Sequence, residues 1–281
     1  MGIDFSAAVH FFKMQGSGND FVVIDNRTAK VAVDDMADWA KSLCRRAFGI
    51  AADGLFFLEE APERDDVDFR WHFYNADGSR AEMCGNGSRC AARLAYELGM
   101  APVEHSIGTD AGVVRAKVLP ELGQVKVQLT DPFDERLNIE VGLSDDLNIC
   151  HFVNSGVPHA VVFTDDVEEV DISAMGSKLR FHEEFAPAGT NANFAQVVDK
   201  EHMLLRTYER GVEDETYACG TGACASVFLA HRLGLTGPVV EVTTSGGEKL
   251  VVDVTDGKLF LQGGAEITFQ GEANLTSLGL A

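Results

Sequence analysis

Short runs of alternating apolar and polar residues dominate the chain, with Gly, Asp and Asn between them. Such runs are typical of half-buried strands joined by tight turns. We expect strands at residues 113–118, 125–129, 239–243, 250–254 and 259–261. Helices are fewer, and the clearest span residues 34–48, 85–98 and 220–233. The last two end at Gly99 and Gly234, where glycine favours helix termination. The pattern predicts an α+β protein.

Two segments of the chain repeat each other. Cys84-Gly85-Asn86-Gly87 and Cys219-Gly220-Thr221-Gly222 begin stretches that match at seven of sixteen positions, at an offset of 135 residues. Earlier in each half, Gly16-Ser17-Gly18 and Asn154-Ser155-Gly156 precede apolar strand-like runs, at an offset of 138. Two landmarks in the same order and at nearly the same offset indicate an internal duplication.

The duplication predicts two similar domains with α/β-type halves. The turn-rich segment 130–134 is the natural boundary, so we expect one domain at residues 1–132 and the second at 133–266. We expect the last segment, residues 267–281, to add a strand to the first domain.

Each repeated segment places a cysteine directly before Gly-x-Gly and an Ala/Leu-rich helix. The backbone N–H groups of such a helix start bind anions, and their partial positive charge favours a thiolate. Inversion of a stereocentre beside a carboxylate needs a base on one face of the carbon and an acid on the other. Cys84 and Cys219 therefore predict an acid–base pair, although a free cysteine is more often a small buried apolar residue. Cys44, Cys90, Cys150 and Cys224 lack this setting, and we interpret them as packing residues.

Composition excludes several other functions. The 281 residues carry 44 acidic and 23 basic side chains, a net charge of −21 that would repel nucleic acids and anionic membranes. No apolar run approaches the ~20 residues that cross a bilayer, and the chain does not open with a basic and then apolar leader, so we expect a cytoplasmic protein. The six cysteines form no Cys-x-x-Cys pair, so we expect reduced thiols and no zinc site.

Cofactor motifs are weak or missing. Gly220 to Ala225 fits the Gly-x-Gly-x-x-Ala dinucleotide fingerprint, but polar residues 213–216 precede it where a buried strand is required. Neither a phosphate-binding loop nor a zinc-binding His-Glu-x-x-His helix occurs. We expect neither a cofactor nor a metal.

Five motifs together resemble the diaminopimelate epimerase family, over residues 12–272: Gly16-Ser17-Gly18-Asn19-Asp20-Phe21, Phe73-Tyr74-Asn75-Ala76-Asp77-Gly78-Ser79, Met83-Cys84-Gly85-Asn86-Gly87, Tyr208-Glu209-Arg210-Gly211 and Ala218-Cys219-Gly220-Thr221-Gly222. The resemblance implies two pseudo-symmetric domains, each a barrel-like curled sheet around a central helix, with the active site in the cleft between them. It also implies epimerisation of LL-diaminopimelate to the meso isomer without pyridoxal phosphate, in lysine and peptidoglycan precursor synthesis.

The resemblance assigns roles to individual residues. Cys84 and Cys219 are the base and acid, and His159 and Glu209 tune the pKa values of their thiols. The remaining residues bind the substrate: Asn19, Asn75, Gly85, Asn86, Asn191, Glu209, Arg210, Gly220 and Thr221. Arg210 would pair with the distal carboxylate and Glu209 with the distal ammonium. The plainer alternatives are that Asn19 and Asn75 are turn residues and that Glu209 and Arg210 form a surface ion pair.

Two positions depart from the family pattern, and both lose a polar side chain expected near the substrate. Gly54 stands where Gln is frequent, and Val157 stands where Asn is frequent. A proline- or histidine-racemase-like enzyme is therefore an alternative. A non-catalytic amino-acid-binding protein and a redox switch through a Cys84–Cys219 disulfide are others. For an epimerase, a racemase or a binding protein the partner is a small amino acid, and a homodimer is compatible with each of these three hypotheses.

Overall fold

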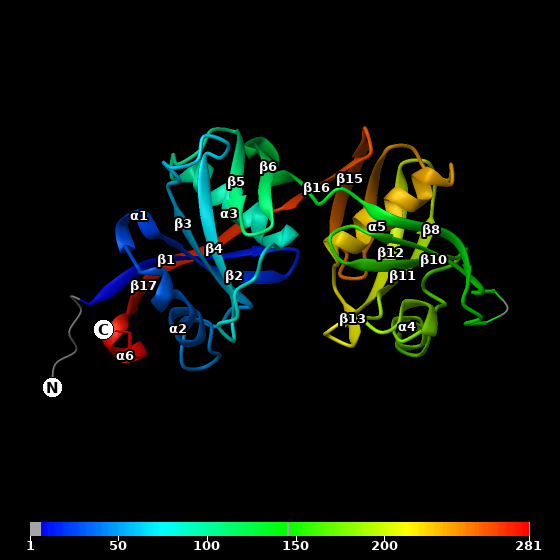
Figure 1. Cartoon of the computed structure of the whole chain (residues 1–281), viewed down its shortest axis with the longest axis horizontal. Helices are drawn as coiled ribbons and strands as arrows, with labels where there is room; N and C mark the ends of the chain where they lie inside the picture. Colours follow the sequence, from blue (N-terminus) through cyan, green and yellow to red (C-terminus); the bar gives the residue numbers. More distant parts are fainter. Residues whose placement is uncertain (1–6, 145, 281) are drawn as a thin grey trace. The chain divides into compact units, whose positions relative to one another are not determined.

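The chain folds into two compact units in the computed structural model, which describes residues 7–144 and 146–280 (Figure 1). The first unit comprises residues 7–127 and 264–280, and the second comprises residues 128–263. The sequence-based division placed the boundaries after residues 132 and 266. The ends of the predicted ranges, residues 1–6 and 281, lie outside the described residues.

The first unit contains a mixed sheet with helices on both of its faces. Its strands are β1 (Ala8–Gly16), β2 (Asn19–Asp25), β3 (Gly54–Glu59), β4 (Phe69–Asn75), β5 (Glu104–Thr109), β6 (Gly112–Leu119), β7 (Gln124–Gln128) and β17 (Glu266–Asn274). Its helices are α1 (Asn26–Ala29), α2 (Val33–Leu43), α3 (Gly85–Glu97), the 3₁₀ turn Pro120–Leu122 and α6 (Leu275–Leu278). β17 pairs antiparallel with β1, so the end of the chain completes the N-terminal sheet.

The second unit has the same architecture. Its strands are β8 (Phe133–Glu140), β9 (Ile149–Asn154), β10 (Pro158–Phe163), β11 (Asn191–Val197), β12 (His202–Glu209), β13 (Asp214–Thr216), β14 (Val239–Thr244), β15 (Lys249–Thr255) and β16 (Lys258–Gly264). Its helices are α4 (Ile172–Arg180), the 3₁₀ turn Glu183–Phe185 and α5 (Gly220–Arg232).

The strand pairings of the two units repeat. In the first unit, β1 pairs antiparallel with β2, β2 parallel with β3, β3 antiparallel with β4, and β4 parallel with β5. In the second, β9, β10, β11, β12 and β14 follow the same sequence of directions. Helices α2 and α4 occupy equivalent connections, as do α3 and α5. The predicted pair of pseudo-symmetric domains is confirmed.

One central helix in each unit is surrounded by strands, as Figure 1 shows for α3 and α5. α3 packs against β1, β2, β3, β5, β6 and β17, and α5 packs against β9, β10, β11, β12 and β15. Residues 222–230 of α5 are all buried. A helix with buried residues all around needs small side chains, which explains the Ala, Ser and Cys content of both helices. The barrel-like sheet around a helix is therefore confirmed.

A further helix in each unit, α2 in the first and α4 in the second, covers the outer face of the sheet. Met36, Trp39 and Leu43 of α2 pack with residues of β2 and β3, and Ile172 and Leu179 of α4 pack with residues of β9 to β12. These strands are buried on both faces, so they appear in the sequence as continuous apolar runs.

Two helix predictions need correction. The helix predicted at residues 34–48 ends at Leu43, because the chain then reverses through Ala47, whose φ is +67°. Helix α4 was not predicted from the sequence. It begins at Ile172, directly after the N-cap residue Asp171, whose side chain accepts a hydrogen bond from the Ala174 N–H.

Candidate active site

The register of the strands places the predicted residues of the first unit at one end of the sheet. Gly54, the first residue of β3, pairs with Phe21 of β2 and with Asn75, the last residue of β4. Asp53 directly precedes Gly54, and Asn19, the first residue of β2, stands two positions before Phe21. The Asn19 amide donates to the Asp53 carboxylate. The parallel β2–β3 pair therefore brings Asn19, Asp53 and Asn75 to the same end of the sheet.

Cys84 lies at the start of α3, as predicted. Its Sγ accepts a hydrogen bond from the Gly87 N–H at 3.4 Å, and its S–H donates to Asn19 Oδ1 at 3.6 Å. The N–H groups of the first helical residues, Gly85 and Asn86, have no hydrogen-bond acceptor within the helix itself. The structure thus brings Cys84, Asn19, Gly85 and Asn86 together, at a helix start suited to anions.

Asn75 is engaged in a turn. Its amide donates to Ser79 Oγ at 3.0 Å, and its backbone N–H donates to the Ser79 carbonyl at 2.9 Å. This is the turn role that the sequence left as the alternative. Asn75 is nevertheless exposed at the end of β4, and its backbone carbonyl accepts a hydrogen bond from the Gly78 N–H at 2.9 Å.

Gly54, where the family frequently has Gln, admits no side chain on this backbone. A Cβ there would lie 2.6 Å from the Phe73 ring and 2.9 Å from the Tyr74 carbonyl oxygen. Gly54 and Asn191 are the first residues of the equivalent strands β3 and β11. The close packing of Phe73 therefore goes together with the absence of a polar side chain at position 54.

We expect Gly54→Ala to destabilise the protein by about 1–3 kcal/mol, because the added methyl group overpacks a rigid strand. Gly264→Ala is the matched control, since a Cβ there meets no atom within 4 Å. Chemical denaturation of both variants measures the difference. Equal stability of the two variants would contradict the packing argument.

The predicted residues of the second unit lie at the equivalent end of its sheet. His159 of β10 pairs in register with Asn191 of β11, and Glu209 is the last residue of β12. The Asn191 side chain donates to the Pro158 carbonyl at 2.9 Å and accepts from the Arg210 N–H at 2.8 Å. Asn191 therefore holds the backbone on both sides of it, joining the His159 strand to the Glu209-Arg210 segment.

Cys219 lies directly before α5, with 8% of its surface exposed. Burial and, secondly, the nearby Glu209 carboxylate raise the pKa of its thiol to about 12, against the opposing effect of the Thr221 hydroxyl and the N–H groups of Gly222 and Thr221. The predicted lowering of the thiol pKa by the helix start is therefore wrong for Cys219. Loss of hydration and a like charge outweigh the helix, so Cys219 is a protonated thiol.

A hydrogen-bond chain links His159 to Cys219. His159 Nε2 lies 3.0 Å from Thr221 Oγ1, and Thr221 Oγ1 lies 3.6 Å from Cys219 Sγ. Burial and, secondly, the Arg210 charge lower the pKa of His159 to about 3, so its ring is neutral. Thr221 also receives a hydrogen bond at its carbonyl from Ser155 Oγ at 3.0 Å. The predicted His159, Thr221 and Cys219 thus form one connected group.

Glu209 and Arg210 are not a surface ion pair. Burial raises the pKa of the Glu209 carboxyl, and no carboxylate pairs with the Arg210 guanidinium among residues 7–144 and 146–280. Both act electrostatically on the group around Cys219, since Glu209 raises the thiol pKa and Arg210 lowers that of His159. The partly buried Arg210 cation remains available to an anionic ligand.

We expect Cys219 to react slowly with iodoacetamide at pH 8, with a rate that rises about tenfold per pH unit, because only the thiolate reacts. Glu209→Gln removes the like charge, lowers the thiol pKa and accelerates labelling at fixed pH. Asp214→Asn is the control, because Asp214 opposes Glu209 in the strand pair but is exposed. Mass spectrometry of the Cys219 peptide measures both rates. Slower labelling of Glu209→Gln would contradict the assigned charge effect.

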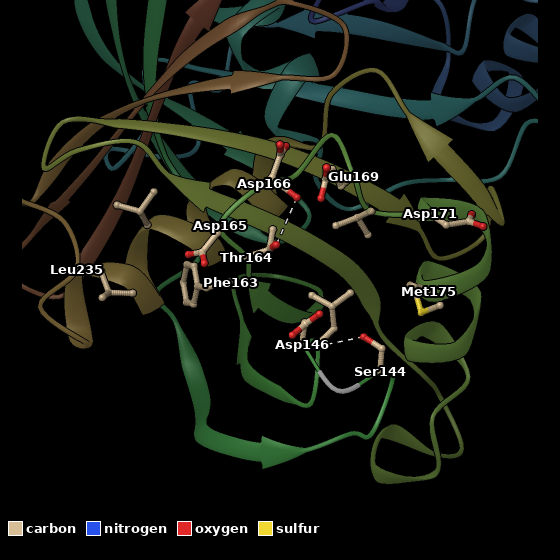
Figure 2. A pocket seen from close by; sticks show the side chains of 13 residues that line it. Ser144, Asp146, Phe163, Thr164, Asp165, Asp166, Glu169, Asp171, Met175 and Leu235 are labelled. Atoms are coloured by element: carbon tan, nitrogen blue, oxygen red, sulfur yellow. Dashed lines mark hydrogen bonds between the residues drawn. The ribbon is translucent and has the colours of Figure 1, made fainter.

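A separate hollow of about 940 Å³ occurs in the second unit (Figure 2). Five carboxylates line it: Asp146, Asp165, Asp166, Glu169 and Asp171. Its lining includes the last residues of β10 and β11 (Phe163 and Val197) and Leu235 beyond α5, whereas His159, Asn191 and Cys219 stand at the beginnings of these elements. The hollow is therefore distinct from the Cys219 group.

Within the described part of the chain, no cluster of three or more His, Cys, Asp or Glu side chains is arranged to hold a metal ion. The described helices include none that is both long and apolar enough to span a membrane.

Sequence reasoning missed Asp53, Ser155 and Asn193. Asp53 holds the Asn19 amide, Ser155 holds the Thr221 carbonyl, and Asn193 contacts His159 Nδ1 at 3.1 Å. Ser155 belongs to the repeated Asn154-Ser155-Gly156 landmark, which was a usable signal. Asn193, a polar residue inside an apolar strand run, was another.

Comparison with known proteins supports the family resemblance. The family model for diaminopimelate epimerase matches residues 11–133 and again residues 151–268. A diaminopimelate epimerase from Aquifex aeolicus is 44% identical over 94% of this chain and 97% of its own length. One from Hydrogenobaculum is 42% identical over 92% and 96%.

Among solved structures, a probable proline racemase from Agrobacterium radiobacter has a TM-score of 0.69 at 16% identity, covering 95% of this chain and 93% of that one. A Bacillus anthracis protein of the PhzF phenazine biosynthesis family has a TM-score of 0.70 at 14% identity, covering 95% and 99%. These two likenesses show the fold. The sequence matches go further, and the chain belongs to the diaminopimelate epimerase family.

Proposed function

We propose that this protein interconverts LL- and meso-diaminopimelate without a cofactor, with Cys84 and Cys219 as the two acid–base groups. The observation that carries the proposal is the equivalent placement of the two thiols, each directly before the central helix of a duplicated unit. One thiolate removes the α-proton, and the other thiol delivers a proton to the opposite face of the same carbon.

The protonation of Cys219 supports a division of roles. A buried thiol with a pKa of about 12 holds its proton at neutral pH, so Cys219 is the donor in the resting enzyme. Cys84 is the acceptor in its thiolate form, in which the Gly87 N–H hydrogen bond stabilises the negative charge on its sulfur. In the reverse reaction the roles exchange. The α-carboxylate binds the N–H groups of Gly85, Asn86, Gly220 and Thr221, which also stabilise charge that develops on it in the transition state.

The other end of the substrate explains the choice of diaminopimelate. The Arg210 guanidinium lacks a carboxylate partner among the described residues, so it is suited to the distal carboxylate. Glu209, whose carboxyl pKa burial raises, gains from a cationic partner such as the distal ammonium. A monoamino monocarboxylic acid such as proline has neither distal group.

Proton NMR in D₂O with purified, reduced protein and no added pyridoxal phosphate or metal tests the proposal. We expect the α-proton signal of LL-diaminopimelate to disappear as the meso isomer grows. Lysine, which lacks the distal carboxylate, should exchange far more slowly. Exchange of proline or histidine alone would reject the substrate and retain the chemistry, and no exchange with any amino acid would reject the enzyme in favour of a binding protein or a redox switch.

We also propose that the protein works in the cytoplasm, where its thiols stay reduced. A homodimer is our expectation for its assembly. Light scattering of the purified protein decides between a mass near 30.3 kDa and twice that value.

A further inference from the structure

Asn193 lies at the centre of a buried polar group that the proposed chemistry does not explain. It stands in the middle of β11, is fully buried, and has neighbours Ala192 and Phe194 that belong to the apolar core. Burying an amide is unfavourable unless each of its polar atoms finds a partner. The contacts of Asn193 therefore need a reason.

The orientation of the Asn193 amide follows from its neighbours. One atom of the amide lies 3.0 Å from the Ala160 carbonyl oxygen, which can only accept a hydrogen bond. That atom is therefore the nitrogen, Nδ2. The other amide atom, Oδ1, lies 3.0 Å from Thr207 Oγ1, whose hydroxyl donates to it.

The nearest acceptor for the remaining hydrogen on Asn193 Nδ2 is His159 Nδ1 at 3.1 Å, whereas the Asn191 carbonyl oxygen lies farther away at 3.5 Å. A ring nitrogen that accepts a hydrogen bond carries no proton, so the proton of the neutral ring is on Nε2. Nε2–H then donates to Thr221 Oγ1. With its oxygen occupied as acceptor, the Thr221 hydroxyl turns its own proton toward Cys219 Sγ.

We propose that Asn193 is a positioning residue that sets the tautomer of His159 and thereby directs the Thr221 hydroxyl proton at the sulfur of Cys219. When the Cys219 S–H bond breaks and its proton passes to the α-carbon, the electron pair stays on sulfur. The Thr221 O–H then hydrogen-bonds the thiolate. The neutral state of His159 is consistent with this chain, since burial lowers its pKa to about 3.

Asn193→Asp is the decisive variant, because it keeps the shape and removes the donor. A carboxylate beside Nδ1 favours a proton on Nδ1, so Nε2 of the neutral ring becomes an acceptor. The Thr221 hydroxyl then donates to Nε2 instead of to sulfur. This inference rests on the proposed function for its kinetic consequence, whereas the tautomer is a property of the protein alone.

The test combines ¹⁵N NMR of the His159 ring with epimerase kinetics. In the wild type we expect an unprotonated Nδ1 and a protonated Nε2. In Asn193→Asp we expect a protonated Nδ1, together with a fall in kcat of about ten- to a hundredfold and little change in KM, because the lost hydrogen bond matters only once sulfur is charged. Thr207→Val is the matched control. It removes the partner on the other side of the amide, but the Ala160 carbonyl still fixes Nδ2, so the tautomer and kcat should be retained.

A wild-type protein with the proton on Nδ1 would overturn the inference, even if Asn193→Asp does not fold. Normal kcat in Asn193→Asp would overturn it as well. Absence of diaminopimelate epimerisation in the wild type would instead reject the proposed function, and the ring nitrogens would still show whether Asn193 sets the tautomer.

Discussion

Removal of either predicted catalytic thiol should lower kcat for diaminopimelate epimerisation by at least about 10³-fold, because proton transfer by a positioned group contributes about 10²–10⁴-fold and both transfers are needed. Cys84→Ala and Cys219→Ala test this directly. The α-proton exchange rate in D₂O and the growth of the meso isomer are measured together for each variant.

The four other cysteines provide controls. Cys44, Cys90, Cys150 and Cys224 are all buried, as predicted for packing residues. Cys150→Ala is a suitable control, since its side chain lies in the core cluster beneath α4. It should cost stability and leave kcat unchanged. A Cys219→Ala protein that epimerises at the normal rate would exclude Cys219 as the proton donor.

Much of the fold was predictable because it depends on local signals. The Cys-Gly repeat and the terminal glycines Gly99 and Gly234, at φ +63° and +73°, defined both central helices. Helix α4 was harder to predict because it contains Gly176, which usually counts against a helix. In the structure Gly176 lets the helix approach Tyr208 so closely that a Cβ would lie 2.5 Å from it. That requirement comes from tertiary packing, which the local pattern does not contain.

The candidate site was predictable in its members and less so in its electrostatics. Within their units, Cys84 contacts Asn19, and Cys219 contacts Thr221, whose hydroxyl also contacts His159. The pKa of Cys219 was predicted in the wrong direction because the helix start is a local feature, whereas burial and the Glu209 charge come from the folded unit. Asn193 acquires its role only through its place beside His159, which depends on the register of β10 and β11.

The second large effect is expected at Gly222, the third residue after Cys219. A Cβ there would lie 2.4 Å from Asn193 Oδ1 and 3.2 Å from Cys219 Sγ. Asn193 cannot move away easily, because Thr207 and Ala160 hold both ends of its amide. Gly222→Ala should therefore destabilise the protein by about 1–3 kcal/mol and displace the thiol. Because a displacement of about 1 Å can cost about 10²-fold in rate, we expect kcat to fall by that order.

A double-mutant cycle with Asn193→Ala separates the two consequences of Gly222→Ala. Truncation of Asn193 removes the atom that the new methyl group would meet first. The double variant should therefore be more stable than the sum of the single variants predicts, which denaturation measures as a coupling free energy. Its kcat should stay low, because the methyl group still lies against Cys219 Sγ and the His159 contact is gone. Additive stabilities would mean that the crowding of Gly222 is relieved elsewhere, whereas recovery of kcat would mean that the position of the thiol does not depend on Gly222.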